Sequence, residues 1–188
     1  LVAKYSPEMK DALYFGHPGN QGEAILWGEQ LSAVPNHLSG YQGHGSVAHP
    51  HGILVTWALM MEGGIQINLE GKRFSNEHQG YSEQAVAVLA QPAKTAFNIF
   101  DHRLRELGRK FEDFRNAEES GAVITAESVE ALAAKIGVDE TALSVTMTEC
   151  EALAHSGEAD DHGRTFNPAT LLTPPYCAVK VTGALVHT

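Results

Sequence analysis

Hydrophobic and polar positions alternate with a period of two in three parts of the chain, and this pattern predicts strands there. Ile65 and Ile67 are separated by a polar residue, and the segment 93–101, AKTAFNIFD, alternates with aromatic and β-branched residues. The third part is 174–188, PPYCAVKVTGALVHT, near the end of the chain. We therefore expect a strand in each of these three places.

The segment 63–77, GGIQINLEGKRFSNE, joins one of these strands to a glycine turn and a dense group of charged and aromatic residues. The pattern predicts a β-hairpin whose turn lies near Glu70 and Gly71 and whose second strand is GKRF. Arg73 and Glu77 have the spacing of an ion pair that follows the hairpin. A structural role is the simplest interpretation of these two charges.

A period near 3.6 in the hydrophobic positions predicts several helices. In 101–116, for example, Leu104, Leu107, Phe111 and Phe114 fall on one stripe, and the charged residues lie elsewhere. The segments with a helical pattern are 19–34, 82–91, 101–116, the second part of 121–138, and 140–157.

Residue types at the ends of two of these helices support the assignment. In 121–138 a short strand leads into a helix for which Thr125 is the expected N-cap and Gly137 the expected end. Asp139 is the expected N-cap of the following helix, which ends at Gly157. Both helices therefore have a predicted beginning and a predicted end.

Two stretches are harder to assign. The segment 53–64, ILVTWALMMEGG, fits a helix or a buried strand, and its Met and Ala residues favour a short helix that ends at Gly63. The segment 40–52, GYQGHGSVAHPHG, is rich in glycine and contains Pro50, so we expect it to be irregular. Taken together, the predicted strands and helices indicate an α+β fold.

Three histidines of the segment 40–52, His44, His49 and His51, raise the question of a metal site, because neutral imidazoles bind zinc, copper or nickel. No cysteine or carboxylate accompanies them locally, and an irregular loop would not hold the rings in a fixed direction. We therefore expect no metal ion. The favoured interpretation is a solvated loop in which one histidine contacts a substrate, and a metal-binding domain is the weaker alternative.

Composition and charge narrow the classes of partner. The formal net charge of −10 argues against nucleic acid and against an anionic membrane surface. No apolar run approaches the ~20 residues that span a bilayer, and charged residues interrupt the N-terminal segment where a secretory signal would lie. Two cysteines, Cys150 and Cys177, offer no disulfide framework, so free thiols and a cytoplasmic location are expected.

The common sequence signals of catalysis are absent from the chain. There is no nucleophilic triad, no P-loop and no pair of catalytic carboxylates, and GHPGNQG is not a dinucleotide-binding turn, because no strand is predicted before it. The chain begins without Met and stops within a strand-like pattern, so we expect it to be a fragment. From the residues alone, the expectation ends at an α+β domain with a histidine-rich segment.

Several stretches along the chain resemble one superfamily of flavoproteins, which includes soluble fumarate reductases, 3-ketosteroid dehydrogenases and tricarballylate dehydrogenases. GGIQINLEGKRFSNE resembles its G-x-hydrophobic-x-N-x-x-G-x-R-F-x-N-E signature, and the segment 127–164 resembles its two helices followed by a D-x-x-x-G-R loop. PPYCAVKVTGALVHT resembles the strand that ends at H-T-x-G-G, and YQGHG stands at the Q-x-H-P substrate loop. NQGEAILWGEQLSA looks like the helix near the flavin.

The resemblance implies a fumarate-reductase-like capping domain together with a bordering piece of the flavin-binding domain. Residues 1–52 would be the remnant of the FAD-binding domain and the substrate loop, 53–182 the capping domain, and 183–188 the return to the flavin-binding part. The Gly-rich half of the flavin-binding domain would lie outside these residues and would be the chain's partner. FAD is the implied cofactor, and this fragment alone is not expected to retain it.

The resemblance also implies roles for individual residues. His44 matches the histidine that binds the substrate carboxylate in soluble fumarate reductases, Thr56 matches their substrate-binding threonine, and His187 matches the histidine of H-H-T, with a substrate-binding or catalytic role. Gly22 and Glu23 stand at the turn that borders the flavin.

At three further positions the chain departs from the fumarate-reducing pattern. Trp57, Met60 and Tyr81 stand where those enzymes carry a Glu and two Arg residues that relay a proton. Trp and Met cannot relay a proton, so a true fumarate reductase is not expected. Tyr81 could donate or accept a proton instead, although a packing role at a helix start is an equal alternative.

Two functions follow as hypotheses. The first is an FAD-dependent dehydrogenase or reductase that, at full length, transfers hydride between a small organic substrate and flavin N5, with the cap excluding water. The second is a non-catalytic binding module that has kept the fold of the cap. An upstream Gly-rich βαβ segment in the gene favours the enzyme, and a start codon near Leu1 favours the module.

Overall fold

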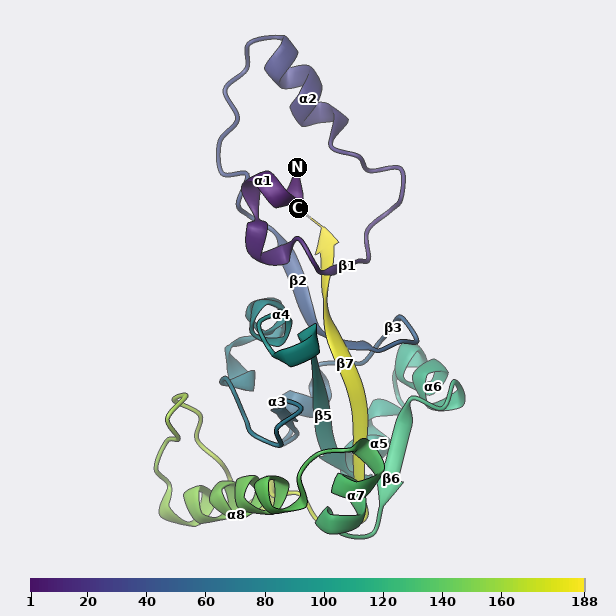
Figure 1. The fold of residues 1–188 in the computed structure, drawn as a ribbon, viewed down its shortest axis with the longest axis vertical. Coiled ribbons are helices and arrows are strands. Elements are labelled where there is room, and N and C mark those ends of the chain that lie inside the picture. Colours follow the sequence, from purple (N-terminus) through teal and green to yellow (C-terminus); the bar gives the residue numbers. More distant parts are fainter. Residues whose placement is uncertain (188) are drawn as a thin grey trace.

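One long strand, β7 (Tyr176–His187), organises the fold, because other strands pair with both of its edges (Figure 1). The computed structural model describes residues 1–187. Along one edge, β7 pairs with β6 (Val123–Ala126) and then with β2 (Gln42–Ala48). Along the other edge, it pairs with β5 (Thr95–Asp101) and then with β1 (Leu13–Tyr14). The pairing with β1 is parallel, and the other three are antiparallel.

The outer strands of this sheet are short. β3 (Ile53–Leu54) extends the sheet beyond β2, and β4 (Ile65–Ile67) extends it beyond β5. The helices are α1 (Val2–Tyr5), α2 (Glu23–Gln30), α3 (Ala58–Met61), α4 (Tyr81–Leu89), α5 (His102–Gly108), α6 (Glu112–Glu119), α7 (Val129–Ile136) and α8 (Glu140–Ser156).

The sheet carries a hydrophobic core on each face, because successive side chains of a strand point to opposite sides. Cys177, Val179 and Val181 of β7 lie in a core that is covered by α3, α5 and α6. Ala178, between them, lies in a second core that is covered by α7 and α8. The alternation of β7 therefore decides which helices each of its residues contacts.

Helix α4 lies very close to the sheet because glycines stand beneath it. A Cβ atom on Gly43 would come within 2.7 Å of the Ala85 Cβ, and one on Gly183 would come within 2.7 Å of the Ala85 carbonyl oxygen. At Gly45 the nearest atoms would be those of Gln84, at 2.8 Å. These separations leave no room for a side chain, so the glycines set the distance between α4 and the sheet.

Replacing Gly45 by alanine is expected to lower the free energy of unfolding by about 1–3 kcal/mol, because backbone atoms of α4 would have to move away from β2. Urea unfolding measures this change. Gly28→Ala on α2 is the control, since a Cβ there meets only Ala33 at an ordinary 3.7 Å. Equal stability of the two variants would contradict the close packing of α4.

The structure confirms most of the predicted elements. Strands occur at Ile65–Ile67, Thr95–Asp101 and Tyr176–His187, and the segment 53–64 contains the short helix α3. The helix of 140–157 begins after Asp139, whose side chain accepts a hydrogen bond from the Ala142 backbone N–H, and it ends at Gly157 in a left-handed conformation. Asp139 and Gly157 therefore act as predicted.

The prediction of an irregular segment over 40–52 was wrong, because residues Gln42–Ala48 form strand β2. The glycines that suggested a loop are needed where α4 lies against this strand. The predicted hairpin was also wrong. β4 pairs with β5 rather than with the GKRF segment, although a tight turn does occur, in which Lys72 O accepts the Asn68 N–H at 2.9 Å.

Two details of the predicted helices were also wrong. The segment 101–116 contains two helices, α5 and α6, because the chain turns after Gly108 so that the Phe114 ring lies against that glycine. Phe111, which the predicted stripe would bury, is 43% exposed. The N-cap of α7 is Ser128, whose Oγ accepts the Ala131 N–H at 3.2 Å, whereas Thr125 lies within β6.

Residues 16–41, including α2, extend beyond the end of the sheet at which β7 finishes (Figure 1). Helix α2 forms where the sequence predicts it, but large apolar side chains on it are exposed, with Leu26 at 45% and Trp27 at 62%. Among the helices of residues 1–187, none combines the length and the apolar character needed to cross a bilayer.

Candidate functional site

His44 lies on β2 at the start of an irregular step in the pairing with β7, and its side chain is buried, at 7% exposure. The Ser46 backbone N–H donates to His44 Nδ1 at 3.2 Å. Nδ1 is therefore the acceptor nitrogen, and the neutral imidazole carries its hydrogen on Nε2. Burial lowers the pKa of His44 to about 4, so the ring stays neutral near pH 7.

Tyr81 is the first residue of α4, and its ring stacks on the His44 imidazole with centroids 5.1 Å apart and planes 24° apart. Gln42 Nε2 donates to the Tyr81 hydroxyl oxygen at 2.8 Å. Gln42 is the register partner of His187 across β2 and β7, and directly paired residues lie side by side on one face. The end of the sheet thus brings together His44, Tyr81 and the backbone position of His187, whose side chain is exposed.

Thr56 and Trp57 reach the same place from the turn that begins α3. Trp57 packs edge-on against His44, with ring centroids 6.0 Å apart and planes 88° apart, and its side chain is buried. Thr56 Oγ1 accepts the Ala58 backbone N–H at 3.3 Å, which fixes the first turn of α3. The structure therefore places Thr56 directly beside a residue that contacts His44, whereas His49 and His51 are exposed in the turn between β2 and β3.

Residues 73–77, RFSNE, which we call the RFxNE segment, are held in place by a buried cluster of four charged side chains. This cluster explains why charged residues stand so close together in the segment. Glu77 accepts from Arg73 at 2.6 Å and from Arg164 at 2.8 Å, and the exposed fraction of its side chain is 0%. Arg73 also pairs with Asp160, and both arginines stack on the Phe166 ring. The predicted pair Arg73–Glu77 is confirmed, and the cluster ties the RFxNE segment to the polar loop after α8.

A chain of buried amides continues from this cluster to β2. The Gln66 backbone N–H donates to Glu77 at 2.8 Å, and Gln66 Nε2 donates to Asn98 Oδ1 at 2.7 Å. Asn98 Nδ2 then donates to Ser46 Oγ at 2.7 Å, two residues after His44. A polar network whose members are paired rigidifies the structure around it, so it fixes the backbone that carries His44.

Gly22 and Glu23, the predicted cofactor-binding residues, lie at the start of α2, which extends beyond the end of the sheet (Figure 1). Gly22 has a left-handed conformation with φ of 79° and is the N-cap of α2. Glu23 Oε2 accepts the Gln21 backbone N–H at 3.1 Å. The structure therefore places these two residues on the segment that extends beyond the sheet.

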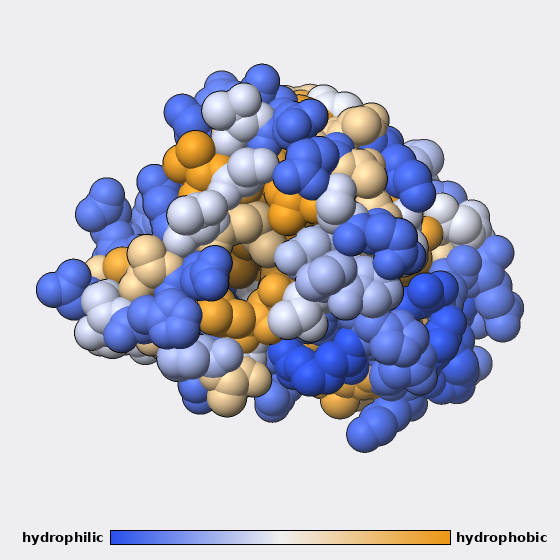
Figure 2. Space-filling model, turned by 90° about the horizontal axis from the view of Figure 1, so that it is seen from below, coloured by the Kyte–Doolittle hydropathy of each residue, from blue (hydrophilic) through white to orange (hydrophobic). Residues whose placement is uncertain are grey.

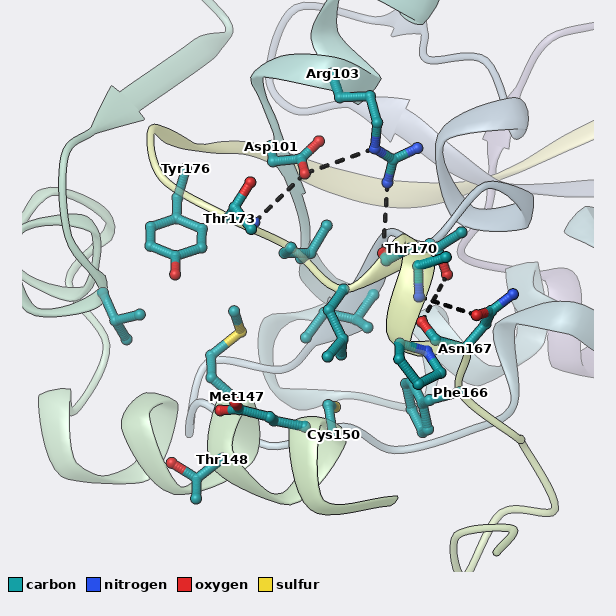
Figure 3. A pocket seen from close by; sticks show the side chains of 18 of the residues that line it. Asp101, Arg103, Met147, Thr148, Cys150, Phe166, Asn167, Thr170, Thr173 and Tyr176 are labelled. Carbon is teal, nitrogen blue, oxygen red and sulfur yellow. Dashed lines mark hydrogen bonds and ion pairs between the residues drawn. The ribbon is translucent and has the colours of Figure 1, made fainter. Parts of the chain in front are cut away.

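Two cavities of the described chain lie elsewhere. One, of approximately 980 Å³, opens at the other end of β7, between α8 and the segment that leads to Tyr176 (Figure 3). The surface at that end is largely hydrophilic, with apolar residues gathered in its hollow (Figure 2). Arg103 and Asp101 border the cavity, but they already lie 3.9 Å apart, and Arg103 donates to backbone carbonyls. None of the predicted site residues lines it.

We regard the group around His44 as the candidate site, because its polar atoms have unused hydrogen-bonding capacity. Sequence reasoning identified His44, Thr56, Tyr81 and His187 through the resemblance, but it did not identify Gln42 as a partner of Tyr81. The signal for Gln42 was present in the motif YQGHG, where Gln42 precedes His44 by two residues. Trp57 was identified only as an apolar wall, and the structure adds its contact with His44.

The free energy of unfolding is expected to fall by about 3 kcal/mol as the pH is lowered from 6.5 to 4, because protonation of His44 favours the unfolded chain. The folded pKa of about 4 lies below the unfolded value of 6.5, so the unfolded chain binds one more proton in that window. The loss begins near pH 6.5 and is complete below pH 4. Urea unfolding at a series of pH values measures it. His44→Gln should make the free energy of unfolding less dependent on pH, whereas substitution of the exposed His155 by Gln should leave that dependence unchanged. The same pH dependence in both variants would contradict the effect of burial on His44.

A comparison with known proteins places the fold and the site in context. The family model described as "FAD binding domain" matches residues 1–188. A fumarate reductase (cytochrome) of Shewanella frigidimarina is 32% identical over 187 residues, which are 100% of this chain and 32% of that protein. A 4-oxocyclohexanecarboxylate 2-dehydrogenase of Sinomonas cyclohexanicum is 27% identical over 164 residues, which are 78% of this chain and 28% of that protein.

A solved structure of the same class has a similar fold. The open conformation of a flavocytochrome c3 fumarate reductase matches with a TM-score of 0.79 and 27% identity, covering 100% of this chain and 33% of that one. The chain thus spans about a third of the length of the relatives it matches. Because the family model covers the whole chain, this chain belongs to the FAD binding domain family, within the superfamily of fumarate-reductase-like flavoproteins.

Proposed function

We propose that this chain forms the capping domain, with a bordering piece of the flavin-binding domain, of an FAD-dependent oxidoreductase. The complete enzyme transfers hydride between a carbon of a small organic substrate and flavin N5, and fumarate is not its natural substrate. The observation that carries the proposal is the stack of Tyr81 on His44, with Gln42 bonded to the phenol, at the end of the sheet where His187 lies. Residues 1–52, 53–182 and 183–188 keep the domain roles predicted for them.

The residues of α2 fit one part of FAD better than another. When bound, FAD supplies the hydride acceptor or donor. Glu23 places a carboxylate at the N-terminus of α2, where it would repel a phosphate but could accept hydrogen bonds from hydroxyl groups. Gly22 and Glu23 would therefore border the hydroxyl-bearing chain of the flavin. The exposed apolar side chains of α2, such as Trp27, fit a helix that the rest of the flavin-binding domain covers.

The cap residues have separate tasks in this proposal. Tyr81 holds or delivers a proton at its hydroxyl oxygen, and Gln42 fixes the direction of that hydroxyl. His44, Thr56 and His187 orient the polar group of the substrate. Trp57 and Met60, which are buried, exclude water and stand where a charged proton relay would be needed for fumarate reduction. Their apolar character favours a substrate other than a dicarboxylate.

Purification of the complete natural gene product tests the proposal. We expect a yellow protein with a flavin absorption spectrum and an upstream Gly-rich βαβ segment, whereas the 188-residue chain alone should be colourless. Substrates can then be sought with a dye as electron acceptor. A complete product that folds but binds no FAD would contradict the proposal and favour the non-catalytic binding module.

A further inference from the structure

Three hydrogen-bond donors that lack an acceptor among residues 1–187 belong to the rings at His44. The donors are the imidazole Nε2–H of His44, the Tyr81 hydroxyl and the Trp57 indole N–H, and the Tyr81 and Trp57 rings each pack against the imidazole, at centroid distances of 5.1 Å and 6.0 Å. They come from β2, from the first turn of α4 and from the turn before α3, so the fold holds them from three sides. Such an arrangement needs an explanation beyond packing.

Each of the three groups is a donor for a stated reason. His44 Nδ1 accepts from the Ser46 N–H, which leaves the ring hydrogen on Nε2. The Tyr81 oxygen accepts from Gln42, which leaves its own hydrogen free to be donated. The Trp57 indole can only donate, and its buried Nε1 has no hydrogen-bond partner within residues 1–187. A buried donor without a partner is costly, and such groups are rare in native structures, so a bound acceptor is the simplest account of Trp57.

Within residues 1–187, the groups that hydrogen-bond or stack with these donors are uncharged. Gln42 and Ser46 are neutral, and the imidazole is buried. The arginine of the neighbouring motif, Arg73, is paired with Glu77 and Asp160 in the charge cluster. Uncharged donors do not offset the full charge of a carboxylate that is brought out of water, but they suit a neutral oxygen with strong acceptor character.

We propose that His44 Nε2–H, Tyr81 O–H and Trp57 Nε1–H form a neutral donor cluster that binds the oxygen of a ketone or enone. This inference rests on the proposed function, because it takes the oxygen to belong to the substrate. It assigns Trp57, which occupies the place of a charged relay residue in fumarate reduction, to substrate binding. The cluster selects a carbonyl compound over a dicarboxylate.

Nuclear magnetic resonance of the indole groups in the complete, FAD-loaded protein tests the cluster directly. The protein is labelled with ¹⁵N-tryptophan, and the signal of Trp57 is identified by its loss in Trp57→Phe. Cyclohex-2-enone is the probe. We expect the Trp57 N–H signal to move downfield in a saturable manner. The signal of Trp27, which is 62% exposed on α2, reports non-specific binding of the probe.

A second measurement does not depend on the stability of a Trp57 variant. The infrared carbonyl stretch of bound cyclohex-2-enone should shift to lower frequency, and Tyr81→Phe should reduce this shift and weaken binding about fivefold, as expected for one neutral hydrogen bond. Fumarate, in contrast, should not change the chemical shift of the Trp57 indole N–H.

Three results would overturn the cluster while FAD remains bound: no saturable binding of the enone, binding that leaves the Trp57 signal unmoved, or a Trp57 shift with fumarate alone. Absence of FAD from the folded complete protein would instead count against the proposed function. The flavin spectrum is recorded on the same sample, so the two failures are distinguished.

Discussion

Replacing Glu77 by glutamine is expected to lower the free energy of unfolding by about 3–5 kcal/mol, because it removes the negative charge that two buried arginines share. Arg73 and Arg164 have side chains only 8% and 2% exposed, so water cannot take the place of the carboxylate. The Gln66 backbone N–H also donates to Glu77, which couples the cluster to the edge of the sheet. The loss should therefore affect both the loop after α8 and strand β4.

The dependence on pH gives this prediction a second signature. Burial alone would raise the pKa of Glu77, but the hydrogen bonds from Arg73 and the charge of Arg164 outweigh it and hold the pKa below its ordinary value of 4.5. The stability that this carboxylate contributes is complete above pH 4.5 and is lost as the pH falls through the lower folded value. Glu77→Gln should abolish that part of the acid-side loss.

Glu118→Gln is the matched control for urea unfolding of Glu77→Gln. Glu118 also accepts from two arginines, Arg105 at 2.5 Å and Arg109 at 2.8 Å, but Arg109 is 38% exposed and water screens the group. We expect the control to lose less than about 1 kcal/mol. If the two variants lose equal amounts, the buried cluster does not hold the loop in the way described.

The parts of the fold that the sequence predicts are those with a local cause. Period-two alternation places β5 and β7, and Asp139 and Gly157 bound α8, because strand faces and helix caps depend on residues close in sequence. Strand β2 was not predicted because its glycines suggested a loop. The structure shows that they allow close packing of α4, which lies about 40 residues further along the chain. The partner of β4 is likewise set by the sheet rather than by the turn that follows it.

The candidate site shows the same limit. The resemblance identified His44 and Tyr81 by their places in motifs, but nothing in a single sequence shows that their rings stack. Asp160 and Arg164 join Arg73 and Glu77 across 87 residues, so only the fold brings them together. The tautomer of His44 follows from the hydrogen bond to its Nδ1, and the indole N–H of Trp57 has no partner among residues 1–187. Sequence patterns do not encode either feature.

In the complete enzyme that we propose, Tyr81→Phe is expected to slow flavin reduction about 10²–10⁴-fold, because the substitution removes the hydroxyl to which we assign the proton exchange with the substrate while keeping the ring that stacks on His44. The rate is measured in a single turnover by stopped-flow absorbance, with a substrate found by dye-linked screening. FAD content should be unchanged, since Tyr81 lies on α4, in the segment that we assign to the cap.

Tyr14→Phe is the control for this substitution, because Tyr14 is 44% exposed on β1 and its hydroxyl donates only to the His17 carbonyl. If Tyr81 acts only in packing or in substrate binding, the substitution would lower stability or affinity but leave the rate at saturating substrate close to that of the unaltered enzyme. A proton-transfer role for Tyr81 lowers that rate. The phenylalanine variant therefore separates a role of the Tyr81 hydroxyl proton from a role of the Tyr81 ring in packing.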